Sequence, residues 1–213
     1  MPKMYAYNTS ATQVKKRYAM IGSTATQVKK RYAMIGSTAT LVYSAEMPLF
    51  TSGTGKNVGW SSHTARENSG SQTPTVTDNS PTNLFADTKN GSDDSGDGCL
   101  AGWYTTDAID VTGYSKLTLT FSSLYTRWDS YNYIIGGLLS DGKPSYKDGK
   151  NKDMIPFVAS NIFADKKATT QKDVTWEIDI SGVTGSYVVG VYAVKTYENS
   201  RQATFYLTGA KLE

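Results

Sequence analysis

The sequence contains few of the residues on which catalysis, disulfide bonding and membrane insertion depend. Its 213 residues include one histidine, His63, and one cysteine, Cys99. A single cysteine excludes an intrachain disulfide and fits folding in a reducing cytosol, and we expect its thiol to be buried and inert. No stretch approaches the ~20 apolar residues that span a bilayer. Residues 1–5 do not lead into the apolar core of a signal peptide. We therefore expect no membrane partner and no secretory leader.

Acidic residues are absent from the first forty positions. This segment carries seven cations and no acid, and because the net charge of the chain is +3, the remainder carries −4. The seven cations are Lys3, Lys15, Lys16, Arg17, Lys29, Lys30 and Arg31. A basic segment joined to a mildly acidic body indicates an acidic partner. Runs of Lys and Arg also keep exposed edge strands soluble, and the sequence leaves both interpretations open.

The same basic segment is a tandem repeat with a period of fourteen residues. Residues 11–26 read ATQVKKRYAMIGSTAT, residues 25–40 repeat those sixteen letters, and a decayed copy begins at Lys3. Such an array presents the same surface in each unit. A helix of this composition is short, rich in Thr and Gly, and marginal by itself. Gly22-Ser23 and Gly36-Ser37 suit two-residue type II′ turns, so each unit is predicted to be a β-hairpin.

The predicted hairpins need a partner. With a two-residue turn, Ile21 lies opposite Thr24 and Ala19 opposite Thr26, and neither face of the hairpin is wholly polar or wholly apolar. Because an isolated hairpin is marginal in water, we expect the repeats to serve attachment and homo-oligomerisation, with a trimer as the expected state. No known nucleic-acid-binding module accompanies the basic residues, so nucleic acid is not an expected partner. The predicted attachment residues are Lys15, Lys16, Arg17, Tyr18, Lys29, Lys30, Arg31 and Tyr32.

The repeats resemble those of virion-associated proteins from phages and prophages that infect Gram-positive bacteria. In those proteins the unit often reads Lys-Lys-x-Tyr-Val-x-Val-Asn-Gly-Val-Ala-Arg. Here the turn is Gly22-Ser23 instead of Asn-Gly, and the strand that follows reads Thr-Ala-Thr-Gln. The resemblance covers the repeat segment and implies a tail, baseplate or head-fibre component, without distinguishing among them.

The remainder of the chain is predicted to be a β-sandwich. Residues 116–121, KLTLTF, and residues 174–180, VTWEIDI, alternate apolar and polar side chains as half-buried strands do. Turn signals recur about every 8–12 residues, which is typical of a sandwich or jelly roll. The predicted fold class is all-β, with β-hairpin repeats in residues 1–44. A jelly-roll-like β-sandwich follows in residues 45–213, with long polar loops at 61–98.

Three segments of this region resemble carbohydrate-binding-module-like sandwiches. They are residues 107–118, residues 178–191 and the closing residues 207–213. The resemblance covers residues 100–213 and implies the fold. It implies no particular ligand, because the same sandwich also serves as a plain structural module.

The spacing of the polar residues indicates no catalytic centre. His63 lacks an identifiable nucleophile and orienting carboxylate, so it is predicted to be a solvated loop residue. Residues 93–98, DDSGDG, open like a calcium loop, but the twelfth position is Tyr104 instead of a carboxylate. A flexible acidic loop is the preferred interpretation and calcium the alternative. No carboxylate pair for glycoside hydrolysis can be located, because outward-facing strand positions fit the acidic residues as well as a catalytic pair does. These residues are Asp107, Asp110, Glu177 and Asp179. We predict no enzyme activity, no cofactor and no metal.

One aromatic cluster is the candidate ligand site. Residues 125–133, YTRWDSYNY, combine aromatic rings with Arg, Asp and Asn, which suit stacking on sugar rings and hydrogen bonding to their hydroxyls. The alternative is that Trp128 and Tyr131 cap the sandwich edge or lie at a subunit contact. The predicted glycan-binding residues are Tyr125, Arg127, Trp128, Asp129 and Tyr131.

The function predicted from the sequence is that of a non-enzymatic structural protein of a phage virion, of fibre or decoration type. The repeats would anchor it to other virion proteins, and the sandwich would project toward a host cell-surface glycan. The chain would be made in the host cytoplasm and then join the particle. A carbohydrate-binding receptor-recognition module is the alternative.

Overall fold

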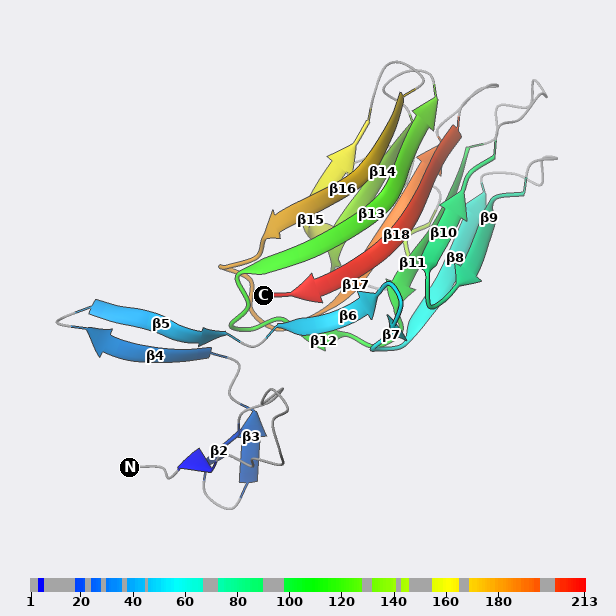
Figure 1. Cartoon of the computed structure of the whole chain (residues 1–213). Helices are drawn as coiled ribbons and strands as arrows, with labels where there is room; N and C mark the ends of the chain where they lie inside the picture. The colour runs from blue at the N-terminus through cyan, green and yellow to red at the C-terminus, as the bar shows by residue number, and fades with distance from the viewer. Residues whose placement is uncertain are drawn as a thin grey trace. The chain divides into compact units, whose positions relative to one another are not determined.

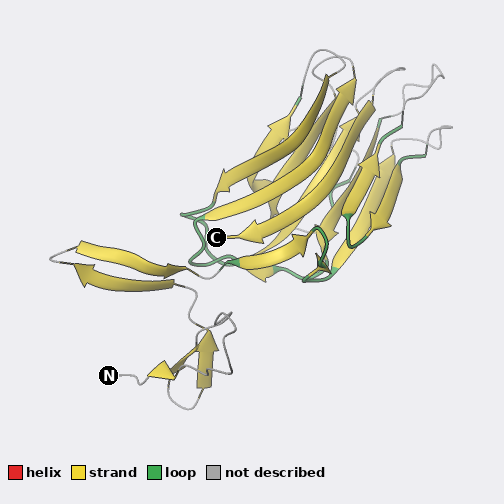
Figure 2. Ribbon diagram, viewed as in Figure 1, coloured by secondary structure: helices red, strands yellow, loops and turns green. Residues whose placement is uncertain are grey.

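The computed structural model describes residues 4–5, 18–21, 24–27, 30–35, 38–44, 46–66, 73–89, 98–127, 132–140, 143–145, 155–164, 169–195 and 202–213, with backbone alone up to residue 44. These residues form strands, turns and loops, and the strands are drawn in yellow in Figure 2. None of the described residues belongs to a helix that is long and apolar enough to cross a membrane. The predicted all-β class is confirmed.

The chain divides into two compact units. Met1–Met47 with Glu213 form one, which we call the repeat unit, and Pro48–Leu212 form the other, which we call the sandwich. The repeat unit holds a three-stranded sheet in the order β1-β2-β3 and a separate pair β4-β5. Its strands are β1 (Met4–Tyr5), β2 (Tyr18–Ile21), β3 (Thr24–Gln27), β4 (Lys30–Ile35) and β5 (Thr38–Ser44).

Each perfect repeat is a hairpin, as predicted. Ile21 lies opposite Thr24 and Ala19 opposite Thr26 in the pair β2-β3. Ile35 lies opposite Thr38 in the pair β4-β5. Each Gly-Ser pair therefore separates two antiparallel strands in sequence, which is the arrangement that a two-residue turn produces.

The sandwich consists of two antiparallel sheets that face each other (Figure 1). The seven-stranded sheet has the order β16-β13-β18-β10-β9, with β6 beside β18 and β7 beside β6. The six-stranded sheet has the order β15-β14-β17-β11-β8, with β12 beside β17. The first strands are β6 (Met47–Thr51), β7 (Gly55–Lys56), β8 (Trp60–Arg66), β9 (Thr75–Asn79), β10 (Asn83–Asp87) and β11 (Cys99–Thr105). The later strands are β12 (Ile109–Asp110), β13 (Lys116–Arg127), β14 (Asn132–Leu139), β15 (Phe157–Phe163), β16 (Thr169–Asp179), β17 (Ser186–Lys195) and β18 (Gln202–Leu212).

Apolar residues on alternate positions of both sheets fill the space between them. In β13 these residues include Leu117 and Leu119, and in β18 they include Phe205 and Leu207, all without exposed surface. The ring of Phe121 lies 4.7 Å from that of Trp176, centroid to centroid. Full burial of each aliphatic or aromatic side chain contributes about 1.5–3 kcal/mol, so this layer is the main source of the fold's stability.

Two similar turns explain the sequence segments that carry the sandwich resemblance. The Asp110 carboxylate accepts a hydrogen bond from the backbone N–H of Thr112 at 2.9 Å. The Asp179 carboxylate accepts one from the N–H of Ser181, also at 2.9 Å. Both acids are exposed and close turns at the ends of strands, as Asp commonly does. Their role is therefore structural.

The polar stretch at 61–98 contains more strand than the sequence indicated. This stretch was predicted to form long polar loops, and it contains the strands β9 and β10. Strand β8 was not expected, and it places His63 in a strand instead of a loop. Because β8 is the last strand in the order of its sheet, it is less covered than a central strand and tolerates Ser, Thr and His at positions where a central strand would be apolar.

Candidate functional site

The sandwich has two outer faces, and the described part of the β14–β15 connection, residues 143–145 and 155–156, packs on the one of the six-stranded sheet. Ile155 from this connection is 3% exposed and packs with buried side chains of three strands. The Pro144 carbonyl oxygen accepts a hydrogen bond from His63 Nε2 at 2.8 Å, and Lys143 Nζ lies 5.8 Å from the ring centre of Tyr104. We call this face the covered face. Besides Ile155, its buried residues are Leu100, Tyr104, Tyr133, Ile135, Leu139, Tyr192 and Val194.

One polar atom on the covered face has no partner among the described residues. Tyr192 has no exposed surface, and its hydroxyl makes no hydrogen bond. Its ring lies near Gly190, where an added Cβ would be 3.0 Å from Tyr192 Cε2. Burial, and then the nearby Tyr104, raise the pKa of the Tyr192 hydroxyl far above its ordinary value. This phenol therefore stays neutral and buried.

The outer face of the seven-stranded sheet, which we call the open face, carries three rows of side chains. The strand registers align neighbours across the sheet, and residues two apart point to the same side. The first row is Thr77, Phe85, Tyr206, Ser123 and Lys172. The second row is Thr75, Asp87, Thr204, Tyr125 and Thr170. The third row is Gln202 and Arg127.

Aromatic rings lie at the middle of the open face. The rings of Phe85 and Tyr206 are 4.8 Å apart, centroid to centroid, and inclined by 48°. Tyr206 is 37% exposed and is one of two large hydrophobic side chains classed as exposed among the described residues. Tyr125 lies on the neighbouring strand β13, in the second row, so it is a diagonal neighbour of Tyr206. Diagonal neighbours in an antiparallel sheet lie about 7–8 Å apart. The three rings therefore form an apolar patch surrounded by hydroxyl and cationic groups.

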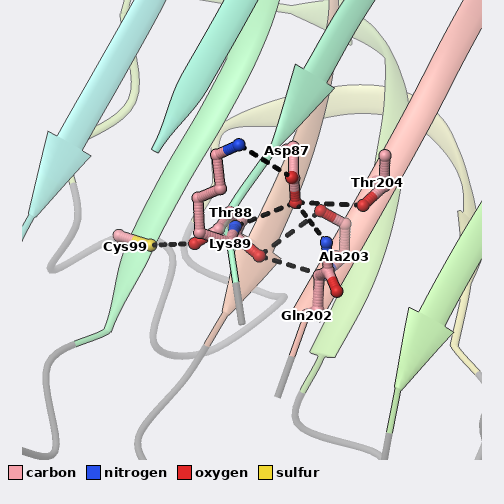
Figure 3. Close-up of polar contacts among 7 residues, drawn as sticks. All are labelled: Asp87, Thr88, Lys89, Cys99, Gln202, Ala203 and Thr204. Atoms are coloured by element: carbon pink, nitrogen blue, oxygen red, sulfur yellow. Dashed lines mark hydrogen bonds and ion pairs between the residues drawn. The ribbon is translucent and has the colours of Figure 1, made fainter. Parts of the chain in front are cut away.

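A hydrogen-bonded carboxylate holds the second row in place (Figure 3). Asp87 Oδ1 accepts hydrogen bonds from the backbone N–H of Lys89 at 2.8 Å, from Gln202 Nε2 at 2.8 Å and from Thr204 Oγ1 at 3.0 Å. Asp87 is 6% exposed, and Lys89 Nζ lies 3.7 Å from its other oxygen. Burial of a charge requires such partners. The network ties β10 to β18 and positions Gln202 and Thr204 beside the aromatic patch.

The bend that follows β10 is anchored to β18 and β11. Thr88 Oγ1 accepts a hydrogen bond from the N–H of Ala203 at 2.9 Å and donates to the Ala203 carbonyl at 3.3 Å. The Cys99 thiol lies 3.5 Å from the Thr88 carbonyl oxygen and is buried, as the sequence predicted. Lys89 adopts a left-handed backbone with φ of 61°. These contacts fix the position of Thr88 and Lys89 at the edge of the open face.

The structure brings together two of the five predicted glycan-binding residues. Tyr125 and Arg127 both lie on β13 and point to the open face, in neighbouring rows. Trp128, Asp129 and Tyr131 lie outside the described residues. Of the predicted attachment residues, Tyr18 lies in β2, and Lys30, Arg31 and Tyr32 lie in β4. The other four, Lys15, Lys16, Arg17 and Lys29, lie outside the described residues.

The remaining candidates for chemistry are placed as structural residues. Glu177 pairs with Lys116 at 2.8 Å on the exposed side of the sheet. Asp107 is exposed, and the acidic loop at 93–97 lies outside the described residues. Among the residues whose side chains are described, no three His, Cys, Asp or Glu side chains gather as a metal site would require. His63 is half-buried instead of solvated, and desolvation is the main reason that its pKa is lowered.

Sequence reasoning missed Phe85 and Tyr206. The alternation in Ala203–Leu207 could have identified Tyr206. Ala203, Phe205 and Leu207 are buried between the sheets, so Tyr206 lies on the outer face of its sheet. Phe85 was visible as an apolar residue in a polar stretch, but its pairing with Tyr206 joins residues more than a hundred positions apart. That pairing depends on sheet order, which a single sequence does not reveal.

Among known proteins, similarity to this chain was found only with solved structures. No protein-family model matches the chain, and no curated protein matches it. A mutant of a family 29 carbohydrate-binding module is similar with 8% identity and a TM-score of 0.37, over 79% of this chain and 91% of that one. The carbohydrate recognition domain of Emp47p has 10% identity and a TM-score of 0.39, over 78% and 93%.

A third solved structure is a family 11 carbohydrate-binding module from Clostridium thermocellum in complex with a mixed-linked tetrasaccharide. It has 11% identity and a TM-score of 0.35, over 78% of this chain and 94% of that one. The sandwich architecture of the present chain follows from its own strand pairing, independently of these likenesses. What each of those proteins binds is a property of that protein.

Proposed function

We propose that this protein is a non-enzymatic carbohydrate-binding protein and that the open face of its sandwich is the binding surface. The observation that supports this most directly is the aromatic patch of Phe85, Tyr206 and Tyr125, set among hydroxyl and cationic side chains. The apolar side of a sugar ring packs against an aromatic ring, and neighbouring polar groups then bond its hydroxyls. A glycan needs both kinds of group on one accessible surface, and the open face offers them.

The two outer faces differ in accessibility, which favours the open one. Ile155 and Pro144 pack on the covered face, so a ligand there would first have to displace them. On the open face, Tyr206 is 37% exposed, and Phe85 and Tyr125 are partly exposed. The open face therefore binds without a prior rearrangement, which avoids an energetic cost that would weaken affinity.

The repeat unit supports a second part of the proposal, namely that the sandwich is displayed on a phage particle. The repeats are a compact unit separate from the sandwich, and their sequence resembles repeats of virion-associated proteins. In this proposal the basic hairpins attach to other virion proteins and the sandwich reaches a host cell-surface glycan. Removing residues 1–44 should leave sandwich-mediated glycan binding intact while abolishing incorporation into particles.

A glycan array tests the binding proposal. Wild-type protein should bind a defined subset of surface polysaccharides, and Tyr206→Ala should lose that binding. Tyr187→Ala is the matched control, because Tyr187 is a partly buried tyrosine on β17 of the other sheet. Both variants should retain the far-UV circular dichroism of the wild type. Equal loss in both variants, or no binding by the wild-type protein to any glycan, would contradict the proposal.

A further inference from the structure

The two perfect repeats place one strand sequence in two different surroundings. Residues 16–26 and residues 30–40 both read KRYAMIGSTAT. Strand β2 lies between β1 and β3, whereas β4 pairs, within the described residues, with β5 alone. Among the described strands, β4 therefore has a free edge at the position where its copy β2 has a neighbour.

The strand register identifies the backbone groups on this free edge. Ile35 lies opposite Thr38 on either side of a two-residue connection, and residues in that position exchange backbone hydrogen bonds. Successive residues of a strand direct their N–H and C=O groups to opposite edges. Ala33 and Ile35 therefore bond to β5, while the backbone groups of Tyr32 and Met34 face the free edge.

In β2, the edge that corresponds to the free edge of β4 is already paired with an antiparallel strand. Because Ile21 and Ala19 bond to β3 as Ile35 and Ala33 bond to β5, Tyr18 of β2 directs its backbone groups away from β3. Tyr18 lies opposite Tyr5 of β1, and the two strands are antiparallel. One of the two identical strands is thus paired at this edge, which shows the kind of neighbour that the sequence accommodates.

We propose that the free edge of β4 pairs with β4 of a second copy of this chain, antiparallel about a two-fold axis beside Ala33. Tyr32 of each chain then lies opposite Met34 of the second copy, and all four residues exchange backbone hydrogen bonds. The result is a continuous four-stranded sheet in the order β5-β4-β4-β5. A two-stranded hairpin is marginal in water, and an unpaired edge is a template for a further strand.

The charge pattern favours the antiparallel orientation. Lys30 and Arg31 begin β4, so an antiparallel pair places the two basic ends far apart, with Arg31 opposite Ile35 of the second copy. A parallel pair would set these cations side by side, and like charges in facing positions are destabilising. A two-fold contact is self-complementary and closes, giving a dimer. It therefore differs from the trimer expected from the sequence, and it is independent of the glycan-binding proposal.

Cross-linking of the full-length chain tests the register. Residues that face each other without hydrogen bonds have Cα atoms about 4.5 Å apart, within the range that a disulfide spans. Ala33→Cys should therefore form a disulfide-linked dimer under mild oxidation. Ala19→Cys is the matched control, because it occupies the same position in β2, whose edge is taken by β1. Cys99 is buried and is present in both variants.

Light scattering of the same chain tests the pairing itself. Wild-type protein should be a dimer across the micromolar range. Met34→Pro should be monomeric, because proline removes an N–H that faces the free edge and none that bonds β5. Met20→Pro in the other repeat should remain a dimer. The proposal is overturned by a monomeric wild-type chain, by a Met34→Pro variant that still dimerises, or by equal cross-linking of Ala33→Cys and Ala19→Cys.

Discussion

Replacing Tyr192 by phenylalanine should stabilise the sandwich and leave glycan binding unchanged. The Tyr192 hydroxyl is fully buried on the covered face and makes no hydrogen bond to any described residue. Burying a polar group without a partner costs about 1–3 kcal/mol, a cost that Tyr192→Phe removes while it keeps the ring. The ring remains packed against Gly190 and near His63, whose ring centre is 6.4 Å away.

The gain is large enough to measure by thermal unfolding. For a domain of this size, 1 kcal/mol raises the unfolding midpoint by about 2–4 °C, so calorimetry should show an increase of at least that amount for Tyr192→Phe. The same variant should bind glycan with the affinity of the wild type, because we assign binding to the open face. A lowered midpoint would show that the hydroxyl has a partner. A weakened affinity would show that the covered face, not the open face, holds the ligand.

Three further predictions concern the polar groups and close contacts of the sandwich. Thr126→Val should be stabilising, because the buried Thr126 hydroxyl has no partner among the residues that the structure describes. Thr204→Val should instead cost about 1.5–3 kcal/mol by removing a hydrogen bond to the Asp87 carboxylate, so urea unfolding should give changes of opposite sign in the free energy of unfolding. Gly102→Ala should lower the free energy of unfolding by about 1–3 kcal/mol in the same assay, because its Cβ would overlap the Val191 carbonyl and the Tyr192 ring. An unchanged urea midpoint would refute this packing. Desolvation and then Lys143 lower the pKa of His63 against the opposing effect of the Pro144 carbonyl, so the folded state favours neutral His63. The unfolded chain therefore takes up the proton first as the pH falls below about 6.5, and stability should fall there in the wild type and less in His63→Gln.

The fold class and the hairpins were predictable because they depend on local patterns. Alternation in residues 116–121 and the Gly-Ser pairs of the repeats each specify a strand or a turn from neighbours in sequence. Strand β8 was not predictable in this way. Ser61, Ser62, His63 and Thr64 carry no apolar alternation, and their strand is held by pairing with β11, forty residues further along the chain.

The candidate site was predicted only in part for the same reason. Tyr125 and Arg127 stood out as part of an aromatic and polar cluster in one segment. Phe85 and Tyr206 come from separate strands, and the register that sets them side by side arises from the order of five strands. The sequence also gave no sign that the β14–β15 connection covers the other face, since His63 and Pro144 are far apart in the chain.

Calorimetric titration of the best-bound glycan into wild-type protein and Tyr206→Ala tests the central claim most directly. An aromatic residue at the centre of a binding surface commonly contributes about 1–2 kcal/mol or more, and 1.4 kcal/mol is a tenfold change in affinity. Tyr206→Ala should bind at least about tenfold more weakly than the wild type, with its unfolding midpoint preserved. An affinity equal to that of the wild type would contradict it.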